Sequence, residues 1–241
     1  MPRLFQVPLL PNPYFVGRAR ELRLLRRRRL DLDLSVRRQA LVGHAGVGKS
    51  QLAAEYAHSA RGDFEVSWWI RAEGATTLVD DLVALADALE LPTAPGSDAA
   101  ARLRRLDHWL ENTRLRWLLV FDNAEDPDTL SPFLATAGVG RVIVTSRRSG
   151  WDRIATEIPI RPLSLSVAVR FLARRTARRA DPHMQAVAEK LDGLCLALEH
   201  VGAFVRETRM PMRDFAHLLD RHGFSAADGP VEGHPEPLGA V

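Results

Sequence analysis

A pattern suited to phosphate binding occupies residues 43–50, with the sequence GHAGVGKS. It matches G-x-x-x-x-G-K-[ST] without a mismatch. Its glycines allow the backbone to curl so that successive N–H groups face one anion, and the helix expected after it adds a partly positive N-terminus. Lys49 is then expected to reach the β- and γ-phosphates of a nucleotide, and the Ser50 hydroxyl to ligate Mg²⁺.

A carboxylate suited to hold the same metal ends the apolar run LLVFD at residues 118–122. A buried strand that ends in Asp is typical of a Walker B segment. From the C-terminal edge of a parallel sheet, Asp122 would reach the Mg²⁺ shell beside Ser50. The alternative interpretation is an ordinary strand that ends in an Asp122-Asn123 turn.

Short apolar runs alternate with amphipathic stretches around these motifs. The apolar runs predict strands at residues 39–42, 66–70, 117–121, 142–145 and, more weakly, 156–160. The amphipathic stretches predict helices at residues 18–30, 49–59, 77–89, 99–111 and 128–134. Because strands and helices alternate, the sequence predicts an α/β fold with a parallel sheet and helices on both of its faces.

The pattern changes after Pro162, where only helices are predicted, at residues 164–178, 181–190, 195–207 and 213–220. We therefore expect four parts along the chain. They are an extended arm or linker at residues 1–12, a nucleotide-binding domain at 13–162, a small all-helical domain at 163–221 and a disordered tail at 222–241.

Composition describes an ordinary globular chain of 241 residues, with 46% hydrophobic and 26% charged residues. A single cysteine, Cys195, excludes an internal disulfide, no apolar run reaches the roughly 18 residues of a membrane span, and the proline-interrupted N-terminus does not resemble a signal peptide. We expect a cytoplasmic protein without membrane contact.

The basic residues are nearly all arginine, with lysine only at Lys49 and Lys190. The formal net charge is only +3, so we interpret the bias toward arginine as a genomic preference and not as an adaptation for binding nucleic acid. The run Arg26 to Arg29 lacks the interleaved aromatic residues that stack on bases. Nucleic acid is therefore not an expected partner, although a DNA-binding regulator acting through its arginines stays open.

Five blocks, in this order, resemble the NB-ARC ATPases of the STAND class, in particular their bacterial members. They are FVGR at residues 15–18, the phosphate-binding pattern, LLVFD, VIVTSR at 142–147 and GLCLAL at 193–198. The resemblance implies a P-loop NTPase domain followed by a small helical domain. It also implies that VIVTSR is a sensor strand lying between the phosphate-loop strand and the Asp122 strand.

The resemblance implies a role for each matching position with ATP or ADP and Mg²⁺. Val16 and Arg18 would line the adenine pocket, and the GLCLAL block, through Leu194 and Cys195, would press on the base. Arg147 would sense the terminal phosphate, where a guanidinium suits a bidentate contact. Ser50 and Asp122 would hold the metal, and the groups expected to act in catalysis are Lys49, Asp122 and Arg147. The phosphates would be held by Gly46, Val47, Gly48, Lys49, Ser50 and Gln51.

Two positions depart from the family pattern. The acid that often follows the Walker B aspartate is Asn123 here, and an amide cannot take a proton from an attacking water. Glu125 or Asp126 are possible substitutes, and an acidic turn is also ordinary before a helix that begins near Pro127. The family proline is Cys195, which we expect to pack as a plain apolar residue.

We therefore expect an ATP/ADP-binding molecular switch with slow intrinsic ATPase activity, which controls domain opening and assembly. The alternative is a non-hydrolysing, nucleotide-dependent oligomerisation scaffold; a small-molecule kinase fits the VIVTSR and GLCLAL blocks less well. The family's Met-His-Asp motif does not occur in this sequence, so the chain looks like the core of a larger signalling protein. Its expected partners are adenine nucleotide, copies of itself, or effector and sensor domains in defence or transcription regulation.

Overall fold

The computed structural model describes residues 4–26, 38–92, 94, 96–134 and 139–222. These residues form two compact units. The sheet unit takes the described residues of Met1–Pro11, Arg20–Gly43 and Lys49–Ile160, and the helical unit takes those of Asn12–Ala19, His44–Gly48 and Arg161–Val241. The phosphate-binding pattern is thus divided, with His44–Gly48 in the helical unit and its flanks in the sheet unit.

The sheet unit contains, within the described residues, a parallel sheet with the strand order β1-β3-β4-β5-β2-β6. The order places β5 between β2 and β4, as predicted for the sensor strand. The strands are β1 (Leu4–Gln6), β2 (Arg38–Val42), β3 (Val66–Arg71), β4 (Trp117–Ala124), β5 (Arg141–Ser146) and β6 (Thr156–Pro159).

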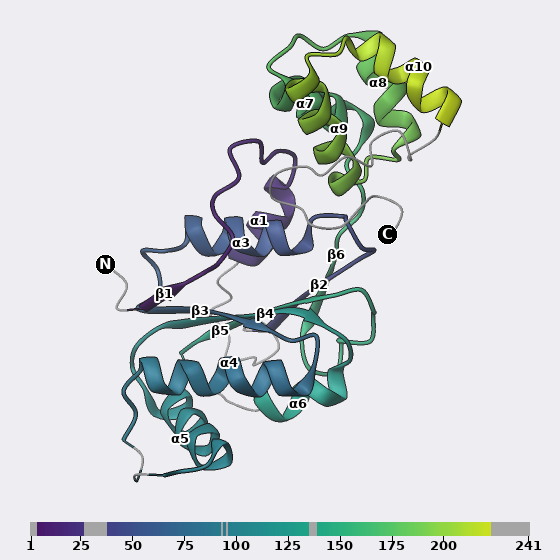
Figure 1. The fold of residues 1–241 in the computed structure, drawn as a ribbon. Helices are drawn as coiled ribbons and strands as arrows, with labels where there is room; N and C mark the ends of the chain where they lie inside the picture. Colours follow the sequence, from purple (N-terminus) through teal and green to yellow (C-terminus); the bar gives the residue numbers. More distant parts are fainter. Residues whose placement is uncertain (1–3, 27–37, 93, 95, 135–138, 223–241) are drawn as a thin grey trace. The chain divides into compact units, whose positions relative to one another are not determined.

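Helices cover both faces of this sheet (Figure 1). On one face lie α1 (Ala19–Arg26) and α3 (Lys49–Ser59), and on the other α4 (Ala75–Ala88) and α6 (Pro127–Leu134), with α5 (Ala99–Asn112) packed against α4. The central strands are therefore buried on both sides, which explains why Trp117 to Phe121 are all buried and apolar. This architecture is that of an α/β P-loop NTPase.

The helical unit has its own hydrophobic core. It is built from α7 (Leu165–Thr176), α8 (Pro182–Lys190), α9 (Cys195–Thr208) and α10 (Met212–His222). Leu172, Met184 and Phe215 are fully buried in it, and Tyr14 and Val16 pack against it from the N-terminal segment. None of the helices in the described part of the chain is long and apolar enough to cross a membrane.

The predicted elements are all present, and where both ends are described their boundaries differ from the prediction by at most three residues. The expected arm contributes something that the sequence did not predict, because Leu4–Gln6 pairs in parallel with β3 as the edge strand. At the other end α10 continues to His222, one residue into the predicted tail. Residues 27–30 of the predicted first helix and 223–241 of the tail lie outside the described residues.

Candidate functional site

The last two residues of the phosphate-binding pattern, Lys49 and Ser50, are the first two residues of α3. The Lys49 side chain is buried, with 8% of the residue exposed, and its Nζ donates to the Gly43 carbonyl at 2.9 Å. Burial lowers the pKa of this ammonium group and the charge of Arg147 lowers it further, while Asp122 acts in the opposite direction. A cation held in such a place gains from a nearby phosphate, because the added negative charge offsets its lost hydration.

Two hydroxyl groups converge on one carboxylate oxygen at the C-terminal edge of the sheet. Asp122 Oδ1 accepts a hydrogen bond from Ser50 Oγ at 2.7 Å and another from Thr145 Oγ1 at 2.6 Å. Thr145 Oγ1 also accepts from the Asn123 backbone N–H at 2.9 Å. Hydroxyl and carboxylate oxygens are the hard ligands that Mg²⁺ takes, usually together with water. The residues present therefore fit a magnesium ion held by Ser50 and Asp122.

The strand order brings the predicted residues to one edge because all the strands run in parallel. Lys49 follows β2, Arg147 follows β5, and Asp122 lies near the end of β4. In open α/β sheets, ligands bind at this carboxyl edge. Arg147 is exposed just past β5, and Gln51 lies half-buried in the first turn of α3. Their roles in ligand binding stay predictions.

The end of β4 is irregular where Asn123 replaces the expected acid. The register with β5 shifts between Phe121 and Ala124, and Asn123 adopts a left-handed backbone conformation with φ of 61°. Asn tolerates this conformation better than most residues. Its side-chain Nδ2 donates to Glu73 Oε2 at 3.2 Å. The amide thus contacts an acid from the neighbouring strand end.

Asp126 is one of the two predicted substitutes for the missing acid, and its carboxylate accepts hydrogen bonds from the start of α6. Its Oδ1 accepts from the backbone N–H groups of Asp128 and Thr129, and its Oδ2 accepts from the Thr129 hydroxyl. These hydrogen bonds, the Thr129 hydroxyl first, lower the pKa of Asp126. This arrangement is that of a helix N-cap, and it makes Asp126 a poor proton acceptor. Glu125 is exposed.

The middle of the phosphate-binding pattern packs within the helical unit. Gly46 and Gly48 have φ of 69° and 93°, and a Cβ added to Gly48 would lie 3.3 Å from Cys195 Sγ. The Leu196 N–H at the start of α9 donates to the Gly46 carbonyl at 2.9 Å. Glycine is needed here for both the left-handed backbone and the close approach.

Arg18 and Cys195 both donate to the Val47 carbonyl. Arg18 Nη2 does so at 2.9 Å while its Nη1 donates to the Arg161 carbonyl at 2.8 Å, and only 6% of the residue is exposed. Cys195 Sγ donates at 3.1 Å, and burial raises the pKa of its thiol, which keeps the proton in place. Arg18 therefore braces the backbone of the loop; its predicted contact with adenine stays a prediction.

The remaining adenine-pocket candidates belong to the helical unit. Val16 and Leu194 are half-buried against its core. Sequence reasoning missed two groups in the sheet unit, the Thr145 hydroxyl and the Glu73 carboxylate. Glu73 lies just past the end of β3, and Asn123 lies near the end of the neighbouring strand β4. Inspection of the polar residues at every predicted strand end would therefore have found Glu73.

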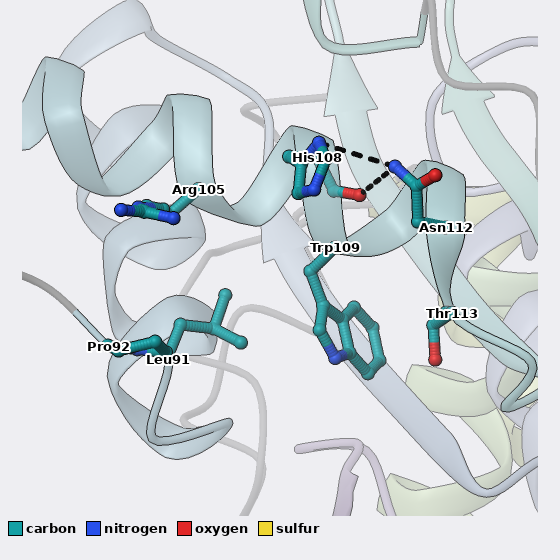
Figure 2. A pocket seen from close by; sticks show the side chains of 7 residues that line it. All are labelled: Leu91, Pro92, Arg105, His108, Trp109, Asn112 and Thr113. Carbon is teal, nitrogen blue, oxygen red and sulfur yellow. Dashed lines mark hydrogen bonds between the residues drawn. The ribbon is translucent and has the colours of Figure 1, made fainter.

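A separate cavity of about 280 Å³ lies beside α5 (Figure 2). His108, Trp109 and Asn112 line it from the helix, and Asn112 Nδ2 donates to the His108 carbonyl at 2.8 Å. The other lining residues are Leu91, Pro92, Arg105 and Thr113. None of the predicted site residues lines this cavity.

Comparison with known proteins gives the chain its relatives. The sequence model of the NB-ARC domain family matches residues 27–169 of this chain. A nucleotide-binding leucine-rich repeat (NLR)-like protein of Hyaloscypha variabilis is 22% identical, over 92% of this chain and 25% of its own length. This chain therefore spans about a quarter of that relative.

Solved structures share the fold at low identity. Cdc6p of Pyrobaculum aerophilum superposes with a TM-score of 0.59 at 16% identity, covering 84% of this chain and 65% of its own. A STAND protein with a tetratricopeptide repeat sensor from Pyrococcus horikoshii gives 0.53 at 17% identity, covering 80% and 30%. At these identities the likeness concerns the fold alone.

Proposed function

This chain belongs to the NB-ARC domain family, and we propose that it is the ATP/ADP-binding switch module of a STAND signalling protein. The observation that carries the proposal is the convergence of the Ser50 and Thr145 hydroxyls on Asp122, beside the buried ammonium group of Lys49. This is the set of groups that a triphosphate and its metal need. Family membership supports nucleotide binding by this set.

In the proposed site the loop N–H groups and Lys49 hold the β- and γ-phosphates. Ser50 and Asp122 would hold Mg²⁺, which when bound neutralises charge on the phosphate oxygens. Arg147, just past β5, is the proposed sensor of the terminal phosphate. Val16, Leu194 and Cys195 are proposed to bind the adenine side of the ligand.

We further propose that ADP and ATP favour different arrangements of the two units. A ligand shifts such an equilibrium only through its unequal affinity for the two states, and each 1.4 kcal/mol of difference is about tenfold. Since the chain spans a quarter of its NLR-like relative, we propose that it works with effector and sensor regions in defence or transcription control. Assembly of several copies would be the output.

The test is to identify the nucleotide that the protein carries and to measure its affinity. Freshly purified protein is denatured, and any released nucleotide is identified by ion-exchange chromatography. Stripped protein is then titrated calorimetrically with ADP, ATP and, as a control for base recognition, GTP, each with Mg²⁺. We expect adenine nucleotides to bind and GTP to bind at least tenfold more weakly. A stripped protein that binds neither ATP nor ADP would refute the proposal.

A non-hydrolysing scaffold is the second candidate, favoured by Asn123 at the position of the usual acid. Single-turnover hydrolysis of γ-labelled ATP, with protein in excess, separates the two functions. A slow release of phosphate supports the switch with intrinsic ATPase activity. Bound ATP that stays intact over many hours supports the scaffold.

A further inference from the structure

Glu73 is an exposed carboxylate two residues past the end of β3, where it accepts a hydrogen bond from Asn123 Nδ2. We propose that Glu73 is the general base for ATP hydrolysis, in place of the acid that Asn123 has replaced. The inference rests on the proposed function, since it names a group for the reaction at that site. It assigns a role to a residue that no motif in the sequence marks.

The position of Glu73 in the sheet unit supports this role. In the sheet β3 is the neighbour of β4, and Arg71 pairs with Asp122 in register. The next residue, Ala72, donates its N–H to the Asp122 carbonyl at 2.7 Å. Glu73 follows Ala72 directly, so it lies at the same carboxyl edge of the sheet as Asp122, Lys49 and Arg147.

The contact with Asn123 orients the Glu73 side chain. Asn123 Nδ2 lies 3.2 Å from Glu73 Oε2, so the amide orients the carboxylate at the place where a second acid is expected. The left-handed turn at Asn123 is itself fixed, because its N–H donates to Thr145 Oγ1 and the same hydroxyl donates to Asp122. A chain of hydrogen bonds thus links the Glu73 carboxylate to the proposed metal site.

Glu73 also differs from the other candidate bases near the end of β4. A general base needs a free lone pair and access to the attacking water. Asp126 uses both carboxylate oxygens to cap α6, and Asn123 has no basic oxygen to offer. Glu73 is exposed to solvent, and among the described residues Asn123 donates a hydrogen bond to one of its two carboxylate oxygens, so Glu73 keeps lone pairs that can accept a proton. Glu125 is also exposed and serves as the matched comparison.

In the proposed step one water oxygen forms a bond to the γ-phosphorus of ATP. The bond from that phosphorus to the β–γ bridging oxygen breaks, and the bridging electron pair leaves with ADP. The proton lost by the water passes to the Glu73 carboxylate and from there to solvent or to the released phosphate. No further oxidant, reductant or co-reactant is needed.

The experiment compares the full chain with Glu73→Gln and Glu125→Gln, each as a stripped protein. ADP affinity with Mg²⁺ is measured by calorimetry, the rate of ATP cleavage by single-turnover hydrolysis, and folding by thermal melting. We expect Glu73→Gln to bind ADP within about threefold of the wild type and to cleave ATP at least about 100-fold more slowly, the lower range for loss of a general base. Glu125→Gln should keep both properties within about threefold.

Each other outcome has a definite meaning. Cleavage by Glu73→Gln within about threefold of the wild-type rate overturns the assignment, as does a loss confined to Glu125→Gln. A wild type that binds ATP and leaves it intact also overturns the assignment but leaves nucleotide binding in place. A wild type that binds no adenine nucleotide refutes the proposed function itself.

Discussion

Lys49 is a buried lysine, with 8% of the residue exposed, and burial lowers the pKa of its ammonium group while Asp122 acts in the opposite direction. In the proposed site, removal of the Lys49 charge would leave the phosphates of a bound nucleotide without their main counter-charge. We expect Lys49→Ala to weaken ADP and ATP binding by at least about 100-fold, the upper part of the range for loss of a charged hydrogen bond. Titration calorimetry measures the change.

Lys190 provides the matched control, because it is the other lysine of the sequence. It forms an ion pair with Asp220 at the surface of the helical unit, and exposed pairs of this kind contribute little to stability. Lys190→Ala should bind nucleotide like the wild type and unfold within about 0.5 kcal/mol of it. If Lys49→Ala also binds ADP with wild-type affinity, the phosphate site is assigned wrongly.

The start of α9 offers a test at the level of one element. Cys195 is the first residue of the helix, where the N–H has no partner within the helix, and proline fits this position. Leu194 before it is extended, with φ of −69° and ψ of 116°, as a residue before proline prefers. We expect Cys195→Pro to fold with unchanged or slightly higher stability in urea denaturation, by up to about 1 kcal/mol.

Proline one residue later should have the opposite effect. The Leu196 N–H donates to the Gly46 carbonyl, and Leu196→Pro removes this donor and restricts Cys195 to extended conformations. We expect a loss of at least about 1–3 kcal/mol in the same denaturation experiment. Equal stability of the two variants would show that the bond between Leu196 and Gly46 contributes nothing.

At the same scale, the sequence predicts elements better than it predicts contacts. The strands β2, β4 and β5 were predicted from apolar runs because burial on both faces leaves that signature. The strand β1 was not, because its three residues are too few to show a period and its partner β3 lies some 60 positions away. The alternation of strands and helices predicted the class of fold, and the resemblance of the ordered blocks predicted the place of the sensor strand; the structure confirms both.

The candidate site shows the same division. Lys49, Ser50 and Asp122 belong to local motifs, so they were found without a structure. The contact between Asn123 and Glu73 joins residues 50 positions apart, one in β4 and the other just past β3, and only the strand order brings them together. Asp126 was left open as a base because a sequence does not show that both of its oxygens cap α6.

For the whole molecule, nucleotide binding should appear as added stability. Any ligand that binds the folded chain and not the unfolded one raises the free energy of unfolding, by about 2.7 kcal/mol at 100 times its dissociation constant. We expect ADP with Mg²⁺ to produce such a rise in a thermal melt, and Lys49→Ala to abolish it. A rise of equal size in the variant would mean that the nucleotide stabilises the protein from another place.

Removal of the metal should affect the stabilisation by ATP and by ADP to different extents. In the proposed site without Mg²⁺, the Asp122 carboxylate would face phosphate oxygens of the same sign, and ATP brings one more phosphate than ADP. We therefore expect EDTA to reduce the stabilisation by ATP more than that by ADP, measured at equal saturation. Asp122→Asn removes the like charge and weakens the metal site together, so the difference between the two nucleotides should shrink in this variant. Equal sensitivity of both nucleotides to EDTA in the wild type would place the metal away from Ser50 and Asp122.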